Sequence, residues 1–161
     1  MTGIFYGSTT GNTGDLANEI ANKLGVDASD VHDVADASVD EVDKYDCLLL
    51  GSSTWGLGDL QDDWEGFIGP LSKKNLSGKK VAFFGCGDSS SYPDTFCDSI
   101  GIIRDALKST GCEFIGAGFT DDYSVTDSKA FENGSPLGLA IDDDEPSKSA
   151  GWIEKWISAI K

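Results

Sequence analysis

A run of small and hydroxyl-bearing residues near the amino terminus has the chemistry of a phosphate-binding loop. It reads Gly7-Ser8-Thr9-Thr10-Gly11-Asn12-Thr13-Gly14. Such residues let backbone N–H groups point inward together, and the start of a following helix adds about half a positive charge, so an anion needs no cationic side chain. Triphosphate loops carry Gly-Lys-Ser/Thr and dinucleotide loops carry three spaced glycines; neither pattern is present. A helix cap needs only one such residue, so the run predicts a bound phosphate.

Two later loops each offer one large aromatic side chain among small polar residues. They read Ser52-Ser53-Thr54-Trp55-Gly56-Leu57-Gly58-Asp59 and Cys86-Gly87-Asp88-Ser89-Ser90-Ser91-Tyr92-Pro93. Trp55 and Tyr92 could each lie on one face of a flat heterocycle, while the glycines let the main chain approach its polar edge. Pro93 favours an extended backbone at Tyr92. One such aromatic alone would more often be packing, but two of them beside a phosphate loop favour a flat ligand.

The elements that must position these loops follow from the apolar periodicity. Short apolar runs indicate five strands, at Ile4–Tyr6, Val31–Val34, Cys47–Leu50, Val81–Phe84 and Phe114–Ile115. Helical stripes lie between or after most of them, namely Leu16, Ile20 and Leu24, then Ile100, Ile103 and Leu107, then Trp152, Ile153, Trp156, Ile157 and Ile160. Strands that are apolar on both faces suit a parallel sheet between helices. We therefore expect an α/β fold, a doubly wound five-stranded parallel sheet with helices on both faces. The three loops then follow strands one, three and four, where such sheets bind ligands.

Length and charge narrow the class of protein. The chain has 161 residues, a length at which we expect one domain over 1–161. Its formal net charge is −16, so we expect no nucleic-acid partner, because phosphates would be repelled. No apolar run approaches the roughly 18 residues that span a membrane, and Met1–Gly7 has no features of a signal peptide. The cysteines Cys47, Cys86, Cys97 and Cys112 match neither a zinc site nor a dense disulfide framework. We expect reduced thiols, no metal and a cytoplasmic location.

These motifs together resemble the flavodoxin family over the whole chain. They are the phosphate loop, Thr54-Trp55, Gln61-Asp62-Asp63-Trp64-Glu65-Gly66, and Gly87-Asp88 leading to Tyr92 and Phe96. Residues 119–139 look like the insertion of the long-chain branch, on the segments Asp121-Asp122-Tyr123, Asp127-Ser128-Lys129-Ala130, Asn133-Gly134 and Gly138-Leu139-Ala140-Ile141-Asp142. One departure is Thr95, where many long-chain members have Asn.

The resemblance implies a noncovalently bound FMN and an electron-transfer protein rather than an enzyme. It places the FMN phosphate on Ser8, Thr9, Thr10, Gly11, Asn12 and Thr13, and the ring between Trp55 and Tyr92. Further flavin contacts are implied along the second loop, at Ser53, Thr54, Gly56, Leu57 and Gly58, and along the third, at Cys86, Gly87, Asp88 and Cys97. A carbonyl between Gly56 and Leu57 could turn to accept a hydrogen bond from flavin N5, since glycine makes the turn inexpensive.

The charges around these loops bear on the redox chemistry. No Lys or Arg occurs in residues 1–22, 45–72 or 81–103, so a flavin there would sit in a negative field. One carboxylate about 10 Å from an anionic reduced flavin, at an effective dielectric of about 20, opposes its charge by roughly 1.7 kcal/mol. We therefore expect a low-potential carrier of single electrons that works through the semiquinone and hydroquinone states.

Partners and alternatives follow from the same residues. We expect a monomer whose partners are redox proteins with basic docking surfaces, such as a flavin reductase donor and a low-potential acceptor, because the negative surface would steer them. The alternative is an FMN-dependent NAD(P)H quinone or nitro reductase of the same fold, but no second phosphate motif is present. A receiver module would carry carboxylates where Ser8 and Ser52 stand. The only histidine, His32, is expected in an edge strand, with a packing or surface role.

Overall fold

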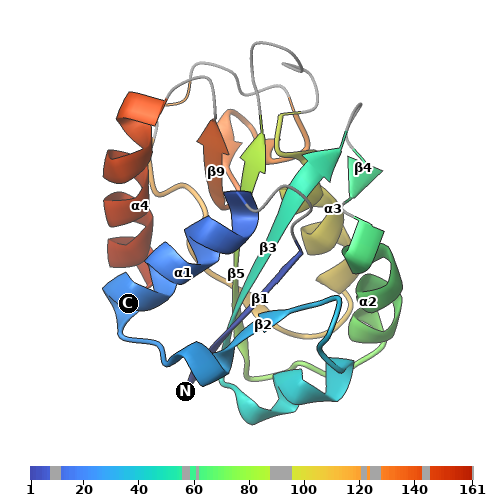
Figure 1. The fold of residues 1–161 in the computed structure, drawn as a ribbon. Coiled ribbons are helices and arrows are strands. Elements are labelled where there is room, and N and C mark those ends of the chain that lie inside the picture. The colour runs from blue at the N-terminus through green and yellow to red at the C-terminus, as the bar shows by residue number, and fades with distance from the viewer. Residues whose placement is uncertain are drawn as a thin grey trace.

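The computed structural model describes residues 1–7, 12–55, 59–60, 62–87, 96–120, 123, 128–142 and 146–160. They form a central sheet with helices on both faces (Figure 1). The strands are β1 (Thr2–Gly7), β2 (Val31–Asp33), β3 (Cys47–Trp55), β4 (Asp59–Leu60), β5 (Lys80–Gly87), β6 (Glu113–Phe114), β7 (Phe131–Glu132), β8 (Ser135–Pro136) and β9 (Leu139–Asp142). The helices are α1 (Asn12–Leu24), α2 (Asp62–Ser72), α3 (Asp98–Leu107) and α4 (Pro146–Ile160), with short 3-10 turns η1 (Ala28–Asp30) and η2 (Val39–Lys44).

The sheet has the order β2-β1-β3-β5-β6, and all of these neighbours are parallel. β9 also runs parallel to β5. β6 pairs with the start of β5, where Glu113 lies opposite Lys80, and β9 pairs with its end, where Asp142 lies opposite Gly87. Two segments therefore share the fifth position. The doubly wound α/β arrangement is confirmed, with the strand order reversing beside β1.

Besides β9, the strands β4, β7 and β8 were not predicted from the sequence, and each of these three has only two residues. β4 pairs antiparallel with the end of β3, at Thr54 and Trp55. β7 and β8 form a hairpin around Asn133 and Gly134, whose φ angles are 54° and 80°. Two consecutive positive φ values are what a tight two-residue hairpin turn requires, and Asn-Gly is the pair that adopts them most readily.

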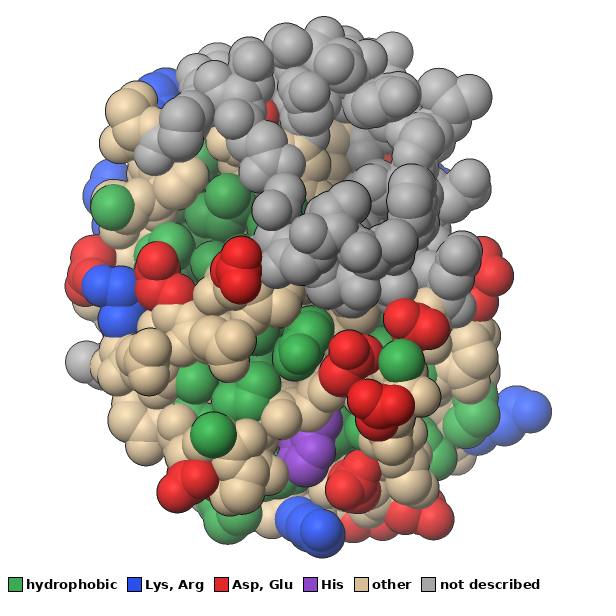
Figure 2. All heavy atoms as spheres, viewed as in Figure 1, with side chains coloured by type: hydrophobic (Ala, Val, Ile, Leu, Met, Phe, Trp, Pro, Cys, Tyr) green, Lys and Arg blue, Asp and Glu red, His purple; other side chains and the backbone are tan. Residues whose placement is uncertain are grey.

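Alternating side chains divide the core into two layers. Ile4 and Leu49 face one side of the sheet and pack with the apolar faces of α1 and α4. Phe5, Leu48 and Leu50 face the other side, where α2 and α3 cover them. This period-two alternation is the reason that the strands are apolar throughout. The surface is acidic, and carboxylate side chains outnumber basic ones on the face shown in Figure 2.

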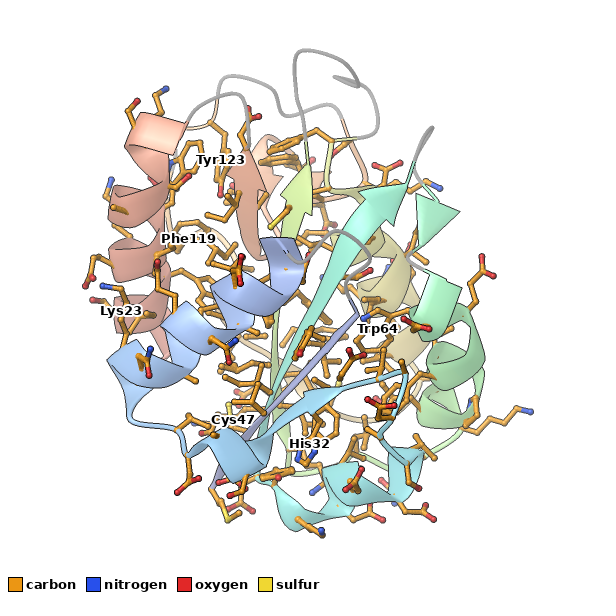
Figure 3. All side chains as sticks on the ribbon, in the orientation of Figure 1. Lys23, His32, Cys47, Trp64, Phe119 and Tyr123 are labelled. Atoms are coloured by element: carbon orange, nitrogen blue, oxygen red, sulfur yellow. The ribbon has the colours of Figure 1, made fainter. Side chains whose placement is uncertain are left out.

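The open edge of β9 is closed by a side chain from the segment before it. The hydroxyl of Tyr123 donates to the carbonyl of Ala140 at 2.8 Å and accepts from its N–H at 3.1 Å. The Tyr123 ring stacks on Trp152 of α4 with centroids 4.4 Å apart (Figure 3). Because an unpaired strand edge can pair with another chain, this contact protects β9 and ties the segment between β6 and β9 to the sheet.

His32 lies in edge strand β2, as expected, and takes part in packing. Its ring stacks on Phe5 with centroids 4.7 Å apart, and Nε2 is 2.8 Å from the Tyr45 hydroxyl. That hydroxyl donates its one proton to Asp30 at 3.0 Å, so His32 Nε2 must be the donor to Tyr45. Burial, followed by the hydrogen bond to Asp30, raises the pKa of Tyr45 to about 12.

None of the four cysteines, all within the described residues, forms a disulfide: Cys86 and Cys97 are buried, whereas Cys47 and Cys112 are half-buried. Among the helices that the structure describes, none is long and apolar enough to cross a bilayer.

Candidate functional site

The three loops singled out by the sequence leave the sheet from neighbouring points. β1 ends at Gly7, which lies opposite Ser52 of β3. Ser53 of β3 in turn lies opposite Cys86 near the end of β5. α1 begins at Asn12, so its amino terminus follows closely after the end of β1 (Figure 1). The carboxyl ends of β1, β3 and β5 and the start of α1 therefore meet at one edge, as a doubly wound sheet requires.

The predicted contact residues divide into those the structure describes and those it does not. Outside the described residues lie Ser8, Thr9, Thr10, Gly11, Gly56, Leu57, Gly58, Asp88 and Tyr92, together with Thr95. Asn12 is the first residue of α1 and Thr13 is fully buried. Ser53, Thr54 and Trp55 complete β3, and Cys86 and Gly87 complete β5.

Gly87 and Cys97 lie at the two ends of the third loop in the sequence, and the structure brings them into contact. A Cβ atom on Gly87 would sit 3.1 Å from both the N and the Sγ atoms of Cys97. Cys97 has a φ of 55°, in the left-handed region, and precedes α3. Its thiol lies 3.9 Å from the carbonyl oxygen of Ile141 in β9. The third loop therefore starts and finishes at one point of the sheet edge, and any larger residue at position 87 would require Cys97 to shift slightly.

Side chains from two helices hold the end of β3. Trp64 of α2, fully buried, donates its indole N–H to the carbonyl of Gly51 at 2.6 Å (Figure 3). Ser99 of α3 donates to the carbonyl of Ser52 at 3.2 Å. A Cβ on Gly85 would lie 2.7 Å from that same Ser52 oxygen, so β5 needs a glycine there. Bonds from both helices therefore determine where the second loop departs.

The electrostatic field at this edge is negative on the side of β1. Tyr6, one residue before the end of β1, has a raised pKa, first because of burial and then because of the charges of Asp33 and Asp36. Both carboxylates follow or end β2, the neighbour of β1. Asp33 and Asp36 therefore place negative charge near Tyr6, at the end of β1.

Two buried carboxyl groups near the edge were not identified as site residues from the sequence. Asp142, 3% exposed, lies opposite Gly87. Asp98, also 3% exposed, begins α3 and accepts a hydrogen bond from the Lys129 N–H at 2.7 Å. Burial raises the pKa of Asp98, although that hydrogen bond and the Lys129 charge act against the shift. A lone Asp at a helix start is usually an exposed cap, so the sequence offered no signal for its burial.

The Asp98→Asn variant should change how stability depends on pH. The folded pKa of Asp98 lies above its ordinary value of 3.8, so the folded protein retains a proton that the unfolded chain has released. Stability from this group is complete below 3.8 and is lost as the pH rises through the folded pKa. Asparagine can still accept from the Lys129 N–H but does not titrate.

Urea unfolding of both proteins, from acidic pH to neutrality, should show the Asp98→Asn variant gaining stability relative to the unsubstituted protein as the pH rises. Asp105→Asn, at an exposed position of the same helix, controls for the loss of one negative charge. A constant difference in stability between the Asp98→Asn variant and the unsubstituted protein at every pH would contradict the assignment.

The described part of this edge offers backbone groups that could bind an anion. The amino terminus of α1 offers backbone N–H donors to an anion, and the approach of Gly87 to Cys97 leaves main chain without a side chain at the end of β5. Among the described residues, no group of three or more His, Cys, Asp or Glu side chains could hold a metal ion.

A family model, curated proteins and solved structures all match this chain over nearly its whole length. The family model described as Flavodoxin matches residues 4–156. Flavodoxin 1 of Escherichia coli is 43% identical over 162 residues, which covers 99% of this chain and 92% of that protein. The flavodoxin of Synechocystis sp. is 41% identical, covering 99% and 95%. The crystal structure of Fusobacterium nucleatum flavodoxin bound to flavin mononucleotide superposes with a TM-score of 0.88 at 28% identity, covering 99% of this chain and 95% of that one.

Proposed function

We propose, because this chain belongs to the flavodoxin family, that it binds FMN noncovalently and carries single electrons between redox proteins. The observation that supports this most is the meeting of three strand ends and the α1 amino terminus at one sheet edge. FMN, when bound, supplies a centre that accepts and releases electrons one at a time. The chain itself needs no acid, base or nucleophile for such a task, so we expect a carrier rather than an enzyme.

The proposed roles of the chain's residues are binding, orientation and charge. The phosphate would contact Ser8–Thr13, where the α1 amino terminus provides donors without a cation. Trp55 and Tyr92 would cover the faces of the ring. Main chain at Gly87, Asp88 and Cys97 would bond its pyrimidine edge, and the closeness of Gly87 to Cys97 supports this. The remaining proposed contacts are Ser53, Thr54, Gly56, Leu57, Gly58 and Cys86.

The charge distribution supports a low potential. The segments that surround the site contain no Lys or Arg, over residues 1–22, 45–72 and 81–103. Asp33 and Asp36 already act on Tyr6 at the end of β1. A carboxylate about 10 Å from an added negative charge opposes it by roughly 1.7 kcal/mol at an effective dielectric of about 20. Adding the second electron is therefore the step that this surface opposes most.

The purified protein should show the visible absorption of an oxidised flavin and release one equivalent of FMN on denaturation. Stepwise reduction should pass through a long-wavelength radical band before bleaching, because the negative field separates the two electron additions. Direct bleaching with no such band would contradict the carrier role. NAD(P)H added alone is the control: flavin reduction without a separate reductase would instead support the quinone or nitro reductase alternative.

Two features of the chain support further parts of the proposal. β6 and β9 lie against the same strand, β5, and the chain between them leaves the sheet and returns; we take residues 119–139 as the insertion typical of long-chain members, within a single domain over 1–161. The four cysteines outside any disulfide and the net charge of −16 fit a cytoplasmic monomer whose redox partners present basic surfaces.

A further inference from the structure

A hollow of about 400 Å³ lies between α2 and the segment that follows β2. We call it the α2 groove. Val34, Ala37 and Val39 form one wall, and Gly66, Phe67 and Pro70 form the other. Val34 and Phe67 are themselves buried, so they form an apolar floor. A Cβ atom on Gly66 would meet nothing within 4 Å, so the absence of a side chain there keeps the groove open.

One carboxylate lines the groove, and two more lie next to its lining residues in the sequence. Asp63 lines the groove. Asp36 stands between the lining residues Ala35 and Ala37, and Glu65 precedes Gly66; both are exposed, and no described residue forms an ion pair with either. Figure 2 shows carboxylates gathered around apolar side chains over the segment after β2 and beside α2.

The segments that form the groove contain no cationic residue of their own. The chain has no Lys or Arg between residues 24 and 43 or between 45 and 72. Lys74 follows α2 in the sequence, and its Nζ lies 3.1 Å from a carboxylate oxygen of Asp40 and 3.0 Å from one of Asp43. Its charge is therefore paired with these two residues, which do not line the groove. The rim of the α2 groove therefore remains negative, and a basic segment is the charge complement of this surface.

The groove also lies beside the proposed flavin site. α2 starts at Asp62, directly after β4, and β4 pairs with Thr54 and Trp55 at the end of β3. On the other side, Val34 follows β2 and its N–H donates to the carbonyl of Tyr6 in β1 at 2.9 Å. Both walls are thus attached to strands whose ends carry the proposed FMN loops. A protein seated in the groove would be held within a short distance of the electron-transfer edge.

We propose that the α2 groove receives one large apolar side chain, such as leucine or methionine, from a basic segment of a redox partner. This inference rests on the proposed function, and it specifies where the redox partner docks and which side chains it presents. Lysine or arginine residues flanking the apolar side chain would pair with the exposed carboxylates of Asp36 and Glu65. Charges at such a rim mainly speed association, whereas a buried apolar anchor slows dissociation.

The test uses the FMN-loaded protein and a synthetic helical peptide with a central leucine flanked by lysines. Gly66→Phe would fill the groove, and Gly151→Phe is the matched control, since Gly151 also lies in a helix with nothing within 4 Å of its Cβ position. We expect the dissociation constant, measured by calorimetry, to rise at least tenfold in Gly66→Phe and to stay within about twofold in Gly151→Phe. Replacing the peptide's leucine with alanine should weaken binding by a similar factor.

A second variant tests the rim separately. Asp36→Lys with Glu65→Lys should weaken binding and flatten its dependence on salt, because the peptide's lysines lose their partners. Equal binding of the peptide by Gly66→Phe and the unsubstituted protein, or equal binding of the leucine and alanine peptides, would overturn the proposal. The proposed function fails by a different readout, namely the absence of FMN from the absorption spectrum, which peptide binding does not influence.

Discussion

Replacing Gly101 with alanine is expected to lower the free energy of unfolding by about 3 kcal/mol. A Cβ atom at this position in α3 would lie 2.1 Å from the carbonyl oxygen of Lys129 and 2.6 Å from its carbonyl carbon. These are backbone atoms, which cannot rotate away as a side chain can. Overpacking a buried contact typically costs about 1–3 kcal/mol, and the upper end applies where the obstacle is rigid.

Other hydrogen bonds join α3 and the residues before it to the segment around Lys129, so a shift of this segment would disturb several contacts at once. Lys129 donates its N–H to Asp98 at 2.7 Å, and the Ser128 hydroxyl donates to the carbonyl of Phe96. Displacing α3 from residues 128–130 would therefore disturb bonds at its amino terminus, beside Cys97 and Gly87. We expect weaker FMN binding as well as lower stability in Gly101→Ala, measured by urea unfolding and by flavin fluorescence.

Gly151→Ala in α4 is the matched control for this substitution. Nothing lies within 4 Å of its Cβ position, so alanine should only raise helix propensity and stabilise the protein by about 0.5–1 kcal/mol. Loss of stability in Gly101→Ala and gain in Gly151→Ala would support the contact. If both variants gained stability alike, α3 would not be held against Lys129.

The second large effect concerns the tryptophan that holds β3. We expect Trp64→Phe to destabilise the protein by about 2 kcal/mol more than Trp156→Phe. Both tryptophans are fully buried, each 0% exposed, and the same substitution removes the same volume at each position. Trp64, however, donates to the carbonyl of Gly51 at 2.6 Å, and losing a buried hydrogen bond costs about 1–3 kcal/mol when the partner is left without a donor.

Trp156 makes the comparison sharp because its indole N–H has no hydrogen-bond partner among the described residues. Phenylalanine there removes a buried polar group that was already unsatisfied, which relieves a penalty rather than creating one. The free energies come from urea unfolding followed by far-ultraviolet circular dichroism, which reports mainly the loss of backbone structure and not indole fluorescence. Equal losses in the two variants would mean that the Trp64 bond to β3 contributes nothing net.

Most of the fold was predictable because its signals are local. The five apolar runs all lie in or overlap observed strands, since a buried parallel strand needs apolar residues on both faces. The stripes at Leu16, Ile20 and Leu24 and at Ile100, Ile103 and Leu107 lie on α1 and α3. The sequence did not predict that β6 and β9 occupy the same position beside β5. That arrangement depends on which part of β5 each of them pairs with, which is a tertiary contact.

The phosphate loop shows where local signals stop. The composition of Ser8–Thr13 already predicts a phosphate loop, and the absence of Lys and Arg around it already predicts a negative setting. These are properties of residue type, so the sequence by itself determined them. Gly87 contacts Cys97, and Trp64 donates to the carbonyl of Gly51, although the two residues of each pair are 10 or more positions apart in the sequence. Asp98 is buried, although the residues next to it in the sequence do not indicate this. Only the tertiary structure decided these, because contact and desolvation depend on which elements pack together.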